Sequence, residues 1–114
     1  MWFAVDGGST QSVGQIVAKY GLGAKGVRSG GYDLTPLSVQ SVQRGSLNFT
    51  IDQQPYLQGF VPVMQLFLYK LSGGLLAPSN TNTGLKFVTR ANVAKYLRTT
   101  SRYEGSSSQE KWIR

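Results

Sequence analysis

The sequence contains no cysteine and no histidine. Without cysteine the chain has no disulfide framework and no thiolate nucleophile. Without histidine it lacks the commonest general acid or base and the commonest transition-metal ligand. Only five acidic residues are present, and they form no recognisable metal-binding or nucleophile motif. We therefore expect no catalytic residues, no bound metal and no cofactor.

Long hydrophobic runs are also missing. The most apolar stretch, Phe60 to Leu71, is interrupted by Pro62, Gln65 and Lys70, and it is well short of the ~20 residues that a membrane-spanning helix needs. The sequence from Met1 meets an acidic residue at the sixth position, too early for the apolar region of a signal peptide. We expect neither a membrane span nor a signal peptide in this chain.

Acidic residues are scarce, which gives 12 basic against 5 acidic side chains and a net charge of +7. Most of the excess lies in residues 61–114, where the basic residues are scattered singly. A nucleic-acid-binding patch is typically a dense run of Lys and Arg. The pattern therefore favours a solvated basic face, and we expect no nucleic-acid partner.

What the chain does contain is an alternation of short apolar runs and amphipathic stretches over its 114 residues. Ser9 or Thr10 is expected to cap the first helix, and Thr35 with Pro36 begins the second. Alternation of this kind predicts an α/β fold of parallel-sheet βαβ units in three layers. Strands are expected at residues 3–5, 26–32, 47–51 and 85–89, with helices to Tyr20, from 36 to before Gly45, at 56–71 and at 92–97.

Three aspartates, Asp6, Asp33 and Asp52, each follow a predicted strand and precede a predicted helix. In a parallel α/β sheet that position is the carboxyl edge, where ligands bind. A carboxylate can accept hydrogen bonds from two neighbouring hydroxyl groups, and the amide of Gln53 can both donate and accept. These side chains suit a sugar. The alternative is that the aspartates only cap helices, a role that Asp favours.

Two tyrosines, Tyr32 and Tyr56, flank these turns. An aromatic ring can cover the apolar face of a pyranose. We therefore treat Tyr32, Asp52 and Tyr56 as secondary candidates for sugar binding, behind Asp6, Asp33 and Gln53.

Three motifs resemble a known family when they are taken in order: Phe3–Asp6, Gly31–Pro36 and Phe49–Gly59. They are similar to motifs of the ribose/galactose-type periplasmic sugar-binding proteins of ABC transporters, in the C-terminal part of those proteins. The resemblance implies that Asp6 stands where the family has an Asn or Asp ligand. It also implies that Asp33 binds sugar hydroxyls and that Gln53 is a ligand near the hinge.

The same resemblance implies a domain organisation. Residues 1–98 form part of a periplasmic-binding-protein-like domain: 1–53 belong to the C-terminal lobe, 54–84 cross to the other lobe, and 85–98 return. Residues 99–114 are a polar tail. The first lobe of the complete receptor, which would follow a signal peptide, is expected to be missing from this chain. The implied partners are a monosaccharide and, for the full-length protein, the transporter permease. The implied location is the periplasm or the extracellular space.

Other functions remain open from the residues alone. The segment Asp6–Thr10 (DGGST) resembles the phosphate-binding turn of sugar kinases with the actin-like fold, although that turn normally lies in a β-hairpin. The glycine spacing does not match the dinucleotide-binding fingerprint. A pair of glycosidase carboxylates would need one aspartate with a raised pKa. Sugar-responsive transcriptional repressors share the same kind of domain and form the last alternative.

The predicted helix at residues 55–71 is apolar around most of its circumference. Such a helix is normally buried on more than one side. If the lobe that covers it in the family is absent, the helix exposes a large apolar patch. We expect the isolated chain to associate, with a homodimer formed through this helix as one outcome.

Overall fold

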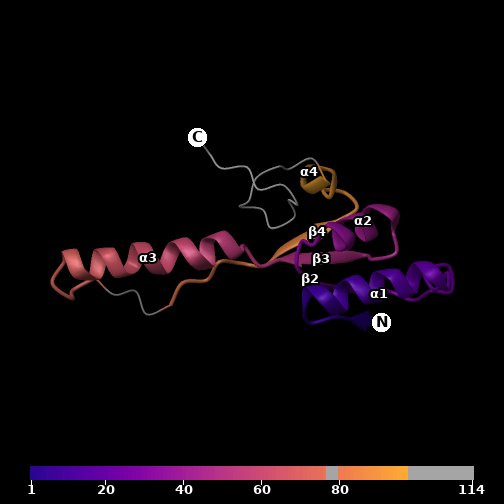
Figure 1. Ribbon diagram of the computed structural model, residues 1–114, viewed down its shortest axis with the longest axis horizontal. Coiled ribbons are helices and arrows are strands. Elements are labelled where there is room, and N and C mark those ends of the chain that lie inside the picture. Colours follow the sequence, from indigo (N-terminus) through magenta and orange to yellow (C-terminus); the bar gives the residue numbers. More distant parts are fainter. Residues whose placement is uncertain (77–79, 98–114) are drawn as a thin grey trace.

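The computed structural model describes residues 1–76 and 80–97. Four strands and four helices alternate along this part of the chain (Figure 1). The strands are β1 (Trp2–Phe3), β2 (Ser29–Tyr32), β3 (Phe49–Asp52) and β4 (Lys86–Thr89). The helices are α1 (Gly7–Lys19), α2 (Pro36–Arg44), α3 (Pro55–Leu71) and α4 (Ala94–Leu97). The tail expected at residues 99–114 lies outside the described residues.

The four strands form one mixed sheet in the order β1-β2-β3-β4. The first three strands are parallel, as predicted, because a helix crosses over between each pair. β4 is antiparallel to β3 and pairs Asp52 with Lys86 and Phe49 with Thr89. The reason is that the chain leaves the end of β3, forms α3 and returns to that same end, so that the next strand runs back along β3.

Helices α1 and α2 pack against each other and against the same face of the sheet. Right-handed crossovers that move along the sheet in one direction place their helices on one side. The core lies under these helices, with Val42 and Val88 fully buried. Its members are Leu34, Val39, Val42, Leu47, Val88, Val93 and Tyr96, with Val13 packed against them.

On the opposite face of the sheet, residues 1–76 and 80–97 place a row of aromatic rings and no helix. Phe3 and Phe49 lie 6.0 Å apart between ring centroids, and Phe49 and Phe87 lie 5.5 Å apart. The ring of Phe49 covers Gly30, where an added Cβ would lie 2.5 Å from the ring atoms. Phe3 and Phe87 remain about half exposed. The described residues therefore supply two layers of the predicted three.

Helix boundaries follow local side-chain chemistry. Thr35 caps α2 by accepting a hydrogen bond from the Ser38 N–H, Pro36 occupies the first turn, and Gly45 ends the helix with φ +84°, all as predicted. The prediction for α1 was wrong by one turn. Asp6 caps this helix, while Thr10, buried and inside the helix, donates to the Asp6 carbonyl at 2.7 Å. An aspartate three residues before a serine is an equally good capping signal.

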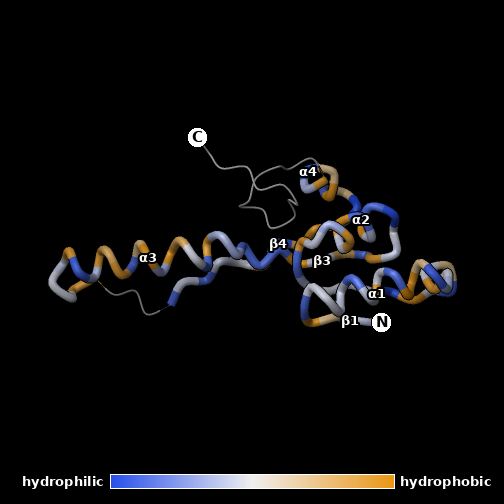
Figure 2. Tube along the Cα trace, in the orientation of Figure 1, coloured by the Kyte–Doolittle hydropathy of each residue, from blue (hydrophilic) through white to orange (hydrophobic). Residues whose placement is uncertain are grey.

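Helix α3 points away from the sheet (Figure 1). None of its 17 residues is buried, although apolar residues occur along its whole length (Figure 2). Its exposed apolar side chains are Tyr56, Phe60, Val63, Met64, Leu66, Phe67, Tyr69 and Leu71. Within residues 1–76 and 80–97, no helix is long and apolar enough to cross a membrane.

Candidate functional site

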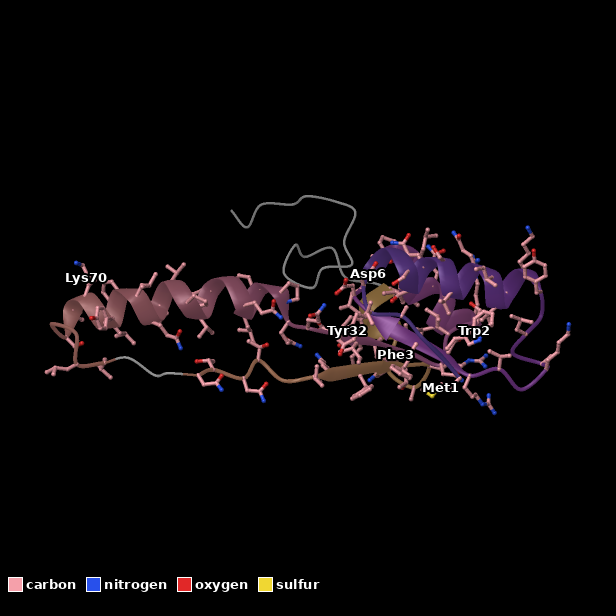
Figure 3. The ribbon with its side chains drawn as sticks, turned by 90° about the horizontal axis from the view of Figure 1, so that it is seen from below. Met1, Trp2, Phe3, Asp6, Tyr32 and Lys70 are labelled. Atoms are coloured by element: carbon pink, nitrogen blue, oxygen red, sulfur yellow. The ribbon has the colours of Figure 1, made fainter. Side chains whose placement is uncertain are left out.

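The carboxyl ends of β1, β2 and β3 meet at one edge of the sheet, because the three strands are parallel. Asp6, Asp33 and Gln53 come just after these three strands. Figure 3 shows Asp6 and Tyr32 at the end of the sheet from which α3 departs, with Met1 and Trp2 at the opposite end. The three principal candidates thus lie at one edge of the sheet.

Asp33 is held from several sides at this edge. Its backbone has φ +74°, a left-handed conformation that Asp tolerates better than most residues. Its N–H donates to the Ile51 carbonyl at 2.9 Å, and its own carbonyl accepts from the Thr50 hydroxyl at 2.7 Å. Strained backbone that the surroundings hold in place is common at binding sites.

Gln53 is joined directly to Asp33. Its Nε2 donates to Asp33 Oδ1 at 2.6 Å. Both side chains are half-buried. The Gln53 carbonyl accepts from Gln58 Nε2 at 2.7 Å and from Thr83 Oγ1 at 3.4 Å. The chain therefore leaves the sheet and comes back to it at this point, and residues 54–84 between are called the α3 arm. The pair retains an amide oxygen and carboxylate lone pairs that can accept hydroxyl protons.

Asp52, a secondary candidate from sequence, has a different environment. It is the last residue of β3 and is only 6% exposed. Its Oδ1 accepts from the Gln54 N–H at 2.9 Å and its Oδ2 accepts from Gln54 Nε2 at 3.0 Å. Gln54 has φ +57° and stands directly before α3. Asp52 therefore fixes the turn between the sheet and α3.

Both carboxylate oxygens of Asp6 take part in capping α1. Its Oδ1 accepts from the Ser9 N–H at 2.9 Å and its Oδ2 accepts from the Ser9 hydroxyl at 2.7 Å. The hydrogen bond from the Ser9 backbone, followed by that from the Ser9 hydroxyl, lowers the pKa of Asp6 below its ordinary value. Asp6 is exposed, so its oxygens keep lone pairs that face solvent.

The rings of the two tyrosines each contact another aromatic ring. The ring of Tyr32 packs edge-to-face on Phe3, with 5.6 Å between centroids, on the sheet face that carries the aromatic row. The ring of Tyr56 stacks on Phe60 at 5.7 Å within α3. Strand pleating directs the Tyr32 ring to the sheet face opposite the core, and Tyr56 stands in the first turn of α3.

Two threonines that support the site were not expected from sequence. Thr10 accepts from the Tyr32 N–H at 3.0 Å, and Thr50 binds the Asp33 carbonyl. Both are fully buried. A hydroxyl in an otherwise apolar strand or helix face is the signal that could have identified them, because a buried hydroxyl needs a partner.

Two grooves lie elsewhere in the described part of the chain. One, of about 340 Å³, lies between α3 and residues 81–83 and is lined by Leu57, Gln58, Val61, Pro62, Gln65, Thr81 and Thr83. The other, of about 240 Å³, lies near the C-terminal ends of α1 and α2. Neither groove includes Asp33 or Gln53. Both side chains of the pair are half-buried at the edge of the sheet.

The alternative sites are less well supported. A phosphate turn at Asp6–Thr10 would require a β-hairpin, but Asp6 caps a helix that begins at Gly7. A glycosidase acid would require a raised pKa, and the lowered pKa of Asp6 counts against Asp6 in that role. Among the described residues no cluster of His, Cys, Asp and Glu side chains could hold a metal ion.

The parallel-dominated α/β fold of this chain is that of periplasmic binding proteins, and solved structures of that class match it. A carbohydrate transporter solute-binding protein from Agrobacterium radiobacter, solved with D-arabinose, matches with a TM-score of 0.68 and 29% identity over 81% of this chain and 30% of its own. The arabinose-binding protein AraP of Geobacillus stearothermophilus matches with a TM-score of 0.67 and 26% identity over 82% of this chain and 34% of its own.

A curated relative is similar in sequence as well. The xylose/arabinose-binding protein XylF of Sulfolobus acidocaldarius is 49% identical over 113 residues. This alignment covers 96% of the chain but only 28% of the relative's length. No protein-family model matches the chain. The chain is therefore similar to part of the periplasmic sugar-binding proteins of ABC transporters, and its relatives are binding proteins, as the sequence motifs predicted.

Proposed function

We propose that this chain is part of a monosaccharide-binding protein of an ABC importer, and that Asp33 and Gln53 bind sugar hydroxyls at the carboxyl edge of the sheet. The observation that carries the proposal is the 2.6 Å hydrogen bond between Gln53 Nε2 and Asp33 Oδ1. It pre-orients a carboxylate and an amide side by side, so that little side-chain entropy is lost when a ligand binds.

A pentose is the substrate class that we propose. The relative and the neighbours are named for, or were solved with, xylose or arabinose, while other neighbours hold myo-inositol and D-allose. Asp6 is proposed as a further ligand through its solvent-facing lone pairs. Tyr32, Asp52 and Tyr56 remain secondary, because their side chains pack on Phe3, Gln54 and Phe60 respectively.

The proposed domain organisation follows the path of the chain. Residues 1–53 supply the βαβ units of one lobe, 54–84 form the arm that crosses to the other lobe, and 85–98 return to the sheet. Of these, residues 77–79 and 98 lie outside the described residues. The complete protein would act outside the cytoplasmic membrane and deliver sugar to a permease. It would bind its substrate without chemical conversion.

Helix α3 is proposed to be an interface that a partner surface covers. In a longer protein the other lobe would cover it, and in the isolated chain a second copy would pack on residues 55–71. Its unburied apolar residues support this, since exposed apolar patches of such length usually mark interfaces. Light scattering over a concentration series tests the dimer, and a monomer at all concentrations would contradict it.

Ligand-observed NMR tests the sugar site. D-Xylose and arabinose should bind the purified chain, and Asp33→Asn or Gln53→Ala should weaken binding on the order of tenfold, the effect of one charge-assisted hydrogen bond. Gln65→Ala is the matched control, because Gln65 donates to Thr81 on the arm. Unchanged affinity in Asp33→Asn would refute the site.

The same experiment addresses the alternatives. Binding of sugar without phosphoryl transfer from ATP fits the receptor, whereas ATP-dependent phosphorylation lost in Asp6→Ala would support the kinase. The sugar-sensing domain of a repressor would bind sugar as well. A longer reading frame that encodes a DNA-binding module would favour the repressor over the importer.

A further inference from the structure

The first turn of α1 provides the space in which the Asp33 carboxylate lies. A Cβ placed on Gly7 would lie 3.0 Å from Asp33 Oδ2, 3.3 Å from Asp33 Cβ and 3.2 Å from Thr35 Cγ2. Side chains at these separations must move by a few tenths of an ångström. Gly7 is a helical residue without a left-handed backbone, so its backbone conformation permits alanine. The obstacle to alanine is the lack of room for its methyl group.

Asp33 cannot easily move away from a methyl group at position 7. Its backbone is fixed at φ +74° by hydrogen bonds to Ile51 and from Thr50, and its Oδ1 is engaged by Gln53. A methyl group at position 7 would therefore displace the carboxylate from Gln53 or push α1 away from the end of β2. The positive end of the α1 dipole also favours a carboxylate at this place.

We propose that Gly7 is a positioning residue for the sugar site. Its missing side chain lets the Asp33 carboxylate rest on the first turn of α1 while Oδ1 still accepts from Gln53. The expected effect on affinity rests on the proposed function. The contact between position 7 and Asp33 does not, because it can be measured without a sugar.

The affinity experiment compares three glycine-to-alanine variants of the chain by ligand-observed NMR with D-xylose and arabinose. Gly7→Ala should weaken binding on the order of tenfold, because the carboxylate is displaced. Gly8→Ala, whose Cβ would lie 3.2 Å from Asp6 Oδ1, reports on Asp6 separately. Gly59→Ala in α3, with no atom within 4 Å of the new Cβ, is the control and should bind like the unchanged chain.

A second experiment measures the contact itself by thermal unfolding. Gly7→Ala is made in the unchanged chain and in an Asp33→Gly background, which removes the carboxylate and suits φ +74°. The variant should lower Tm by about 4 °C or more in the first background. In the second it should lower Tm clearly less or raise it, since alanine favours the helix.

The outcomes separate the two proposals. Equal Tm shifts in both backgrounds would overturn the contact between position 7 and Asp33. Unchanged affinity of Gly7→Ala, in a chain that does bind sugar, would overturn the positioning role. Failure of the unchanged chain to bind either sugar would count against the proposed function, while the comparison of Tm shifts would still decide whether Gly7 accommodates Asp33.

Discussion

The helices of the sheet region and the helix of the α3 arm bury their apolar residues very differently. Helices α1 and α2 each bury apolar residues, such as Val17 on α1 and Val39 and Val42 on α2. Helix α3 is richer in apolar side chains than either of them, yet it buries none. An amphipathic helix can bury its apolar side against one sheet face, whereas a helix that is apolar all round needs partners on several sides.

The contrast supports the proposal that a further surface covers α3. The bare aromatic row of Phe3, Phe49 and Phe87 on the sheet leads to the same conclusion. Both features agree with a chain that spans 28% of a curated relative. The stability of the chain should therefore reside in the sheet region, while the arm contributes little.

The strongest test of this difference uses two leucines. Leu47→Ala removes a core side chain that is 1% exposed, and it should lower the free energy of unfolding by about 2–5 kcal/mol. Leu66→Ala on α3, where the side chain is 65% exposed, should change it by less than about 0.5 kcal/mol. Urea unfolding measures both at a concentration where the chain is monomeric. Equal losses would show that α3 is buried.

Glycine-to-alanine substitutions in the two regions should change stability in opposite directions. At Gly31 the new Cβ would collide with the Thr10 hydroxyl and lie 3.0 Å from Ala4 Cβ, so Gly31→Ala should cost about 1–3 kcal/mol or more. At Gly59 nothing lies within 4 Å, so Gly59→Ala should stabilise α3 by up to about 1 kcal/mol. Denaturation for the first and helical circular dichroism for the second would check these values. A destabilising Gly59→Ala would break the contrast.

The junction between the regions depends on Asp52. In Asp52→Ala the Gln54 N–H and amide lose their acceptors, which should cost about 1–3 kcal/mol because this site is buried. Asp52→Asn keeps one acceptor oxygen and should recover part of that loss. Small-angle scattering should also show a less uniform arm direction in Asp52→Ala. An alanine variant as stable as the unchanged chain would mean that other contacts hold the turn.

The smallest effect concerns pH and the cap of α1. The pKa of Asp6 is lower in the folded chain than its ordinary 3.8, chiefly through the Ser9 backbone hydrogen bond. The cap therefore stabilises the fold fully above that ordinary value, and the contribution is lost as pH falls through the folded pKa. Stability curves of the unchanged chain and Asp6→Ala should converge in acid. A stability difference that stays constant as pH falls through the folded pKa of Asp6 would contradict the stabilising role of this cap.

Much of the fold could be predicted from sequence because its signals are local. Thr35, Pro36 and Gly45 mark the ends of α2 by their own chemistry. The convergence of Asp33 and Gln53 also followed, since parallel strands bring their carboxyl ends together. The antiparallel direction of β4 could not be predicted, because it depends on where the chain returns after α3.

The side-chain roles were harder to predict. Asp52 looks like Asp33 in the sequence, but strand pleating buries its carboxylate and Gln54 occupies it. Asp6 was expected first of all as a sugar ligand, with capping as the alternative, yet both its oxygens accept from Ser9. Which carboxylate oxygen faces a ligand depends on the strand pleat and on the distances between elements. A local sequence motif determines neither of these.

The most direct test is to map sugar binding onto the isotope-labelled chain by NMR. On titration with D-xylose or arabinose to concentrations on the order of 100 mM, where even weak binding registers, the largest shifts should fall on the Gln53 side-chain amide and the Gly7 and Asp33 backbone amides. The residues of α3 should shift little. Shifts confined to α3, or none with either sugar, would contradict the claim that this edge of the sheet is a sugar site.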